Sequence, residues 1–136
     1  MTATTMTTSI ALITYLVRDY DEAIAWFRDA LDFALLQDEA QGAGKRWVVM
    51  APSTQHGARF LLAKAASPEQ STFIGKAAGG RVAFFLHTSD FELLHAKMKS
   101  AGVRFRENPR HEPYGTVAVF EDLYGNRWDL LQPKAA

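Results

Sequence analysis

The amino-acid sequence contains one pattern twice, and this repeat constrains the possible fold more than any other feature. Residues 10–17 are β-branched and aliphatic, as in a strand, and Asp19 follows them at the start of an amphipathic helical pattern. Residues 82–105 repeat this order around Asp90, which lies 71 positions after Asp19. The sequence therefore predicts two copies of a module that begins with a strand and a helix.

A second matched stretch supports the duplication. GARFLLAK begins at Gly57 and GNRWDLLQ begins at Gly125, so these two strand-like segments are separated by 68 positions. Any two amphipathic α/β segments look somewhat alike, which is the alternative explanation. Two matched stretches in the same order argue against it, and both offsets are near half of the 136 residues. This spacing predicts one duplication and not a solenoid of shorter units.

Within the first copy, the helix is expected to begin after Asp19 and to end near Asp32. Asp19 followed three residues later by Glu22 is a capping-box pattern. The rest of this copy is predicted to form strands joined by a polar turn. The expected segments are strands at 33–37, 46–51 and 58–63, with the turn at 52–57.

The chain is predicted to be a single domain, residues 1–136, made of two modules. Module one spans about 9–65, a connector spans about 64–80, and module two spans about 81–133. A hydrophobic content of 48% is enough for one sizeable core. Residues 1–8 are interpreted as a frayed tail. The connector is either a lid over a cavity or a plain linker, and the sequence leaves both open.

Charge and cysteine content exclude several kinds of partner and site. Lys plus Arg equals Asp plus Glu at 15 each, so neither nucleic acid nor an anionic membrane surface is expected as a partner. No segment approaches the roughly 20 apolar residues of a membrane span. The chain has no cysteine, which excludes disulfides and thiolate ligands and fits a cytoplasmic location.

Two stretches resemble those of a known family. VRDYDEAIAWFRDALDF and FEDLYGNRWDLLQP are similar to segments of the glyoxalase/bleomycin-resistance/extradiol-dioxygenase (vicinal oxygen chelate) superfamily, and the resemblance covers residues 10–133. It implies an α+β fold in which two βαβββ modules form curled mixed sheets around a small-molecule cavity. It also favours a homodimer, because curled sheets leave apolar surfaces that a short chain covers poorly.

The resemblance also locates the positions that hold a divalent metal in metal-using members. They correspond here to Leu12, Leu61, Asp129 and either Ala83 or Arg81. Of these side chains only the Asp129 carboxylate can donate a lone pair to a metal. We therefore expect no cofactor and no metal, with a divalent metal held by non-standard ligands as the alternative.

The polar candidates are interpreted in two ways. By strand alternation Arg81, Ala83, Phe85 and His87 are expected to share one face that looks into the cavity. Asp129, His87 and Arg81 then anchor a ligand, or else Arg81 and Asp129 form a structural salt bridge. The ligand-binding set is completed by two aromatic residues, Trp47 on a strand and Tyr114 in a polar loop. Trp128 and Phe60 are predicted to be core residues.

The favoured function is binding of a small aromatic or hydrophobic molecule without a metal. The alternative is a lyase, isomerase or dioxygenase-type enzyme that uses Asp129 and His87 as an acid–base pair or a non-standard metal site. A module without any ligand is the third possibility. Sequence alone identifies neither the ligand nor a reaction.

Overall fold

The structure is a computed structural model that describes residues 4–52 and 57–135. The turn predicted at 52–57 and the start of the N-terminal tail lie mostly outside these residues. The elements of the first module are β1 (Leu12–Val17), α1 (Tyr20–Leu31), β2 (Phe33–Ala40), β3 (Arg46–Pro52) and β4 (Arg59–Lys64). A short helix α2 (Pro68–Thr72) follows in the connector. The second module comprises β5 (Val82–His87), α3 (Phe91–Ser100), β6 (Arg104–Phe105), β7 (Arg110–Glu112), β8 (Gly115–Glu121) and β9 (Arg127–Pro133).

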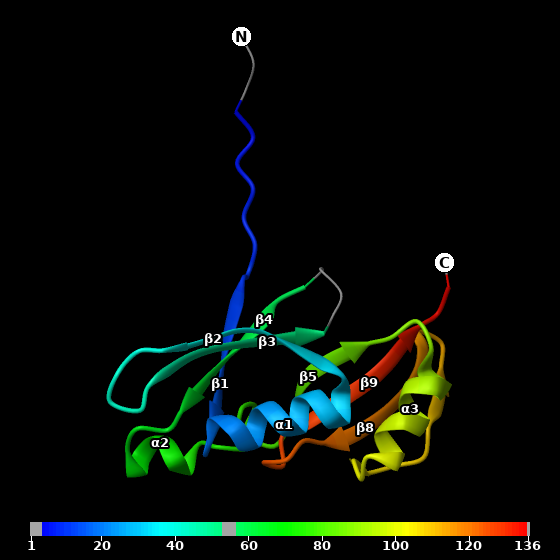
Figure 1. The fold of residues 1–136 in the computed structure, drawn as a ribbon. Helices are drawn as coiled ribbons and strands as arrows, with labels where there is room; N and C mark the ends of the chain where they lie inside the picture. The colour runs from blue at the N-terminus through cyan, green and yellow to red at the C-terminus, as the bar shows by residue number, and fades with distance from the viewer. Residues whose placement is uncertain (1–3, 53–56, 136) are drawn as a thin grey trace.

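Each module forms its own mixed sheet (Figure 1). The first has the order β1-β4-β3-β2, and the second has the order β5-β9-β8-β6 with β7 also paired to β8. In both, the first strand runs parallel to the last one, and the other pairs are antiparallel. This equivalence confirms the predicted α+β fold with two curled mixed sheets.

The two long helices begin at the aspartates that define the repeat. The Asp19 carboxylate accepts a hydrogen bond from the backbone N–H of Glu22, and the Asp90 carboxylate accepts one from Leu93. Both satisfy a backbone donor that a helix N-terminus leaves unpaired. The reciprocal half of the expected capping box does not form, because the Glu22 carboxylate instead accepts from Arg18 and from the Tyr124 hydroxyl.

One hydrophobic core is shared by both sheets and both helices. Phe27 of α1 lies 5.9 Å from Phe60 of β4 and 6.1 Å from Trp128 of β9, measured between ring centroids. Phe60 and Trp128 are 9% and 2% exposed, which confirms their prediction as core residues. Within each strand, the residues between the core residues point away from the shared core. Leu12 of β1 and Asp129 of β9 are examples. We call these opposite sides the open faces of the two sheets.

A buried carboxylate joins the two modules. Asp122, in the turn between β8 and β9, is 6% exposed and accepts a 2.6 Å hydrogen bond from the Tyr15 hydroxyl of β1. Its side chain also accepts from Trp128 Nε1, Asn126 Nδ2 and the backbone N–H groups of Asn126 and Tyr124. Five donors thus compensate the loss of hydration that burial of a carboxylate entails. The conspicuous aspartate and asparagine of the FEDLYGN stretch therefore have a structural role.

The connector is attached to this same turn. The backbone N–H of Ala77 donates to Asn126 Oδ1 at 3.0 Å. Gly75 has φ +80° and lies so close to the Tyr124 carbonyl that a Cβ atom would overlap it. These contacts hold at least residues 75–77 against the β8–β9 turn.

The N-terminal segment before β1 has no regular structure from residue 4 to residue 11 and extends away from the body (Figure 1). Its apolar residues Met6 and Ile10 are 85% and 75% exposed. Among the described residues, no helix has the length and apolar character needed to cross a membrane.

Candidate functional site

A β-bulge in β5 changes the expected alternation of side chains. Val82 pairs with Arg127 and Phe84 pairs with Trp128, so Ala83 is the extra residue. Phe85 and His87 remain in register with open-face residues of β9. The prediction that residues 81, 83, 85 and 87 share one face was wrong. A bulge adds one unpaired residue to a strand, so the side chains before it and after it no longer follow one continuous alternation.

Asp129 lies at the middle of β9, directly between Phe85 of β5 and Val119 of β8. These residues line a pocket of about 540 Å³ on the second sheet, together with Arg81 and Arg127. Three of the residues selected from the sequence, Asp129, Arg81 and Phe85, are therefore brought together. Among the ion pairs of the described residues, none joins Arg81 to Asp129.

A charged cluster borders Asp129. Arg110 donates to both carboxylate oxygens of Glu107, at 2.8 and 3.2 Å, and Glu107 also accepts from the backbone N–H of Val119. The hydrogen bonds from Arg110 lower the pKa of Glu107. Burial raises the pKa of Asp129, opposed by the positive charge of Arg110 and assisted by the negative charge of Glu107. Asp129 itself makes no side-chain hydrogen bond with the described residues.

A second, mainly apolar pocket of about 640 Å³ lies where the two sheets meet. Phe60 of the first sheet and Phe84 of the second approach within 4.9 Å in its wall, measured between ring centroids. Among its described lining residues, His87 has the one ionisable side chain. Phe85 lines this pocket as well as the one at Asp129, and its side chain is 62% exposed. The remaining lining residues are mostly aliphatic or aromatic, and include Phe33, Met50, Leu86 and Trp128.

The other two predicted ligand-binding residues lie elsewhere. Trp47 of β3 lines a pocket of about 500 Å³ on the first sheet, where its Nε1 donates to Gln37. Tyr114 is 53% exposed in the turn between β7 and β8. The six predicted residues therefore do not form a single site within one chain.

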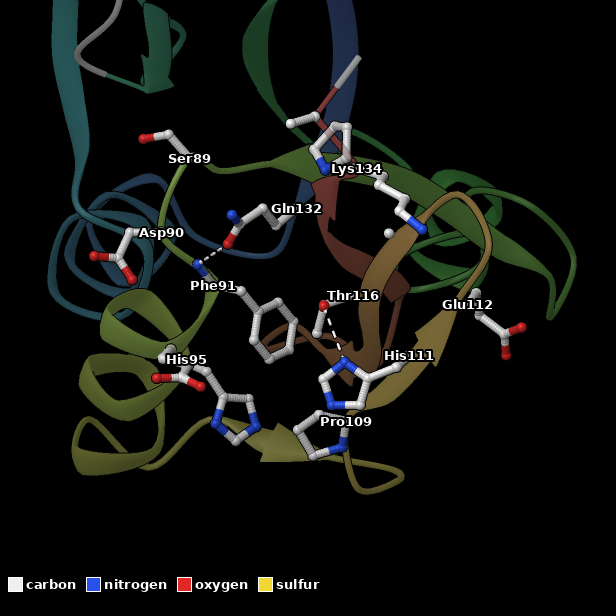
Figure 2. A pocket seen from close by; sticks show the side chains of 14 residues that line it. Ser89, Asp90, Phe91, His95, Pro109, His111, Glu112, Thr116, Gln132 and Lys134 are labelled. Carbon is white, nitrogen blue, oxygen red and sulfur yellow. Dashed lines mark hydrogen bonds between the residues drawn. The ribbon is translucent and has the colours of Figure 1, made fainter.

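The largest of the described pockets, about 780 Å³, lies between the start of α3 and the β7–β8 hairpin (Figure 2). Two hydrogen bonds join residues of its lining to one another. Gln132 accepts from the backbone N–H of Phe91, and His111 Nδ1 lies 3.2 Å from the Thr116 hydroxyl (Figure 2). None of the six predicted residues lines it, so its size alone gives no support to the predicted site.

The residues at the family's metal positions do not fit a divalent ion. Leu12 and Leu61 lie on the first sheet, Ala83 is the bulged residue of β5, and Asp129 lies on the second sheet. Only the last has a donor atom. In the part of the chain that the structure describes, no three His, Asp or Glu side chains gather as a metal site would require.

Some site residues were not selected from the sequence. Arg106, Glu107 and Arg127 line the pocket of Asp129. Arg127 has the same strand parity as Asp129, and this signal was available. Glu107 lies outside any strand. Its contact with Val119 depends on how the segment before β8 folds against that strand, and no local sequence pattern predicts this.

Comparisons with known proteins agree with this architecture. Residues 9–130 match the family model of the Glyoxalase/Bleomycin resistance protein/Dioxygenase superfamily. An uncharacterized protein of Shewanella frigidimarina (strain NCIMB 400) is 51% identical over 128 residues, which cover 93% of this chain and 95% of the relative. The high coverage on both sides shows that the likeness concerns the whole domain.

Solved structures show the same fold. UcmS2 superposes with a TM-score of 0.79 at 29% identity, covering 93% of this chain and 98% of that one. TnmS3, an antibiotic-binding protein from Streptomyces sp. CB03234, gives a TM-score of 0.74 at 24% identity, with 96% and 100% covered. The duplicated modules, their strand order and these matches lead to one assignment. This chain belongs to the Glyoxalase/Bleomycin resistance protein/Dioxygenase superfamily.

Proposed function

We propose that the protein binds a small aromatic or hydrophobic molecule without the help of a metal. The observation that carries this proposal is the apolar pocket of about 640 Å³ between the two sheets, with aromatic walls and His87 among its lining residues. Small-molecule sites are commonly apolar cavities of this size with a few polar groups that orient the ligand. The fold shared with TnmS3, which binds an antibiotic, supports a binding role.

The exposed ring of Phe85 favours an aromatic ligand. A ring that is 62% exposed leaves apolar surface in contact with water, and covering such surface stabilises a complex by about 25 cal/mol per Å². Offset or edge-to-face contacts between rings add about 0.5–1.5 kcal/mol each. A planar aromatic ligand that covers the Phe85 ring would obtain both contributions.

An acid–base reaction by Asp129 and His87 receives less support. General acid–base groups act on protons within hydrogen-bond reach, directly or through one water. Asp129 pairs with Phe85 while His87 pairs with Leu131, so the two side chains are diagonal neighbours. No hydrogen bond joins them among the described residues, and they line different pockets. We therefore base the proposal on binding.

Tryptophan fluorescence tests the location of the ligand. The chain has three tryptophans, and only Trp128 lines the apolar pocket. We expect naphthoquinone or another planar aromatic compound to quench the variant Trp26→Phe/Trp47→Phe, which keeps only Trp128. The matched variant Trp26→Phe/Trp128→Phe keeps only Trp47. Quenching confined to this second variant would contradict the proposal and favour the pocket at Trp47.

We also propose that the protein is a homodimer in which a second copy faces the open sides of the two sheets, so that a ligand on Phe85 lies between the two copies. Leu12 and Phe85 on these faces are 36% and 62% exposed. Their strands, β1 and β5, are each paired on one side only. We expect light scattering to give twice the 15.1 kDa of one chain, and Phe85→Glu to shift the protein toward the monomer. A stable single-chain mass at micromolar concentration would exclude the dimer.

A further inference from the structure

The pocket at Asp129 has an imbalance of charge. Three arginines and two acids line it, and two of these groups already have partners: Arg106 pairs with Glu121 and Glu107 pairs with Arg110. Arg81 and Arg127 form no ion pair with any residue that the structure describes. The pocket therefore presents two guanidinium groups to solvent against one carboxylate, that of Asp129.

The guanidinium groups of Arg81 and Arg127 and the carboxylate of Asp129 lie at different positions along the strands. Arg127 pairs with Val82, the residue next to Arg81, whereas Asp129 lies two residues further along β9, opposite Phe85. One end of the pocket is thus positive, and Phe85 and Asp129 lie beyond it. A guanidinium group can donate two parallel hydrogen bonds to a carboxylate or sulfonate, which gives a stronger and more directional contact than a single charge.

Phe85 lies between this positive end and the apolar pocket, because it is a lining residue of both. A ligand whose ring contacts Phe85 therefore lies beside the pocket that Arg81 and Arg127 line. The connection links the proposed aromatic site to a site for an acidic substituent.

We propose that the ligand is an aromatic acid whose carboxylate or sulfonate is held by Arg81 and Arg127 while its ring covers Phe85. This inference rests on the proposed function and specifies the chemical class of its ligand. It predicts discrimination between molecules that differ only in the acidic group. It also predicts that affinity for the acidic molecule falls as ionic strength rises, because part of the arginine surface is exposed to solvent.

Two fluorescent probes with the same aromatic body test this. Anilinonaphthalene sulfonate carries a sulfonate, and phenylnaphthylamine does not. We expect the wild-type protein to bind the sulfonate probe more tightly than phenylnaphthylamine. We expect Arg81→Gln/Arg127→Gln to weaken that probe by about tenfold or more, because hydrogen bonds to charged groups are lost, while phenylnaphthylamine changes less than about twofold. Arg28→Gln, on the exposed end of α1, is the control and is expected to change neither probe.

The two probes separate the possible failures. If phenylnaphthylamine binds and the double variant binds the sulfonate probe as tightly as the wild type, the acid-binding inference is overturned and the aromatic site stands. If neither probe binds the wild-type protein, both the proposed function and this inference are overturned. Circular dichroism of the double variant checks that its fold is retained.

Discussion

Asp122→Asn should destabilise the protein strongly, although it removes no apolar contact. One oxygen of the Asp122 carboxylate accepts from Tyr15, Asn126 and Trp128, and the other accepts from two backbone N–H groups. An amide has one oxygen, so the new NH₂ group faces donors whichever way it is turned. In the best orientation at least two buried donors lose their acceptor.

The size of the effect follows from these lost acceptors. A buried donor without a partner costs about 1–3 kcal/mol, so two of them predict a loss of about 2–6 kcal/mol in the free energy of unfolding. For a domain of this size that corresponds to a fall in Tm of at least about 6 °C. Urea unfolding followed by circular dichroism should show a lower midpoint with an unchanged m value.

Asp129→Asn is the matched control for this measurement. It makes the same chemical change on β9, the strand that follows the turn of Asp122, at a carboxylate with no side-chain hydrogen bond to the described residues. We expect its Tm to stay at or above that of the wild type. If Asp122→Asn and Asp129→Asn lower the Tm equally, or neither does, then the buried network does not stabilise the junction of the two modules and the reasoning is refuted.

Three further predictions concern the connector, the pH dependence and the metal. Gly75→Ala should lower the Tm more than Gly79→Ala, because both glycines have positive φ but only a Cβ at Gly75 would overlap a carbonyl; equal losses in a thermal melt would show that the close approach is unimportant. Burial raises the pKa of Asp129 in the folded state, so its contribution to stability is present below the unfolded pKa of about 4 and is lost as pH rises through the folded pKa. Asp129→Asn should therefore gain stability relative to the wild type as pH rises above about 4, and a difference that is constant with pH would contradict this. Elemental analysis after exhaustive dialysis should find far less than one Zn²⁺, Ni²⁺, Mn²⁺ or Fe²⁺ per chain, since the residues at the family's metal positions include one donor; one tightly held ion per chain would overturn the metal-free proposal.

Local patterns in the sequence predicted most of the secondary structure. The helix after Asp19 and the helix after Asp90 both begin as expected, and Gly102 follows the end of the second. These features are determined within a few residues, because a cap bonds to a backbone group three positions away and an apolar stripe has the period of the helix. The number of modules was predictable too, because the repeated pattern can be seen in the sequence without knowledge of the fold.

The candidate site was predictable only in part. Asp129, Arg81 and Phe85 were selected from the sequence and do line one pocket, although the bulge at Ala83 breaks the alternation by which Arg81 and Phe85 were expected to share a face. His87 lines the adjoining apolar pocket, while Trp47 and Tyr114 lie apart. Which strand residues meet across two sheets depends on how the sheets pack, and no local period contains that information.

Tertiary structure alone decided the bulge and the buried junction. The extra residue Ala83 in β5 changes which side chains share a face, and it follows from pairing with β9 more than 40 residues later. The hydrogen bond from Tyr15 to Asp122 joins residues 107 positions apart. Tyr15 alternates along β1 as any core residue would, and Asp122 sits in a turn where aspartate is common. That they meet is fixed by the packing of the two modules, because only the folded chain brings a donor and an acceptor so distant in sequence into a dry interior.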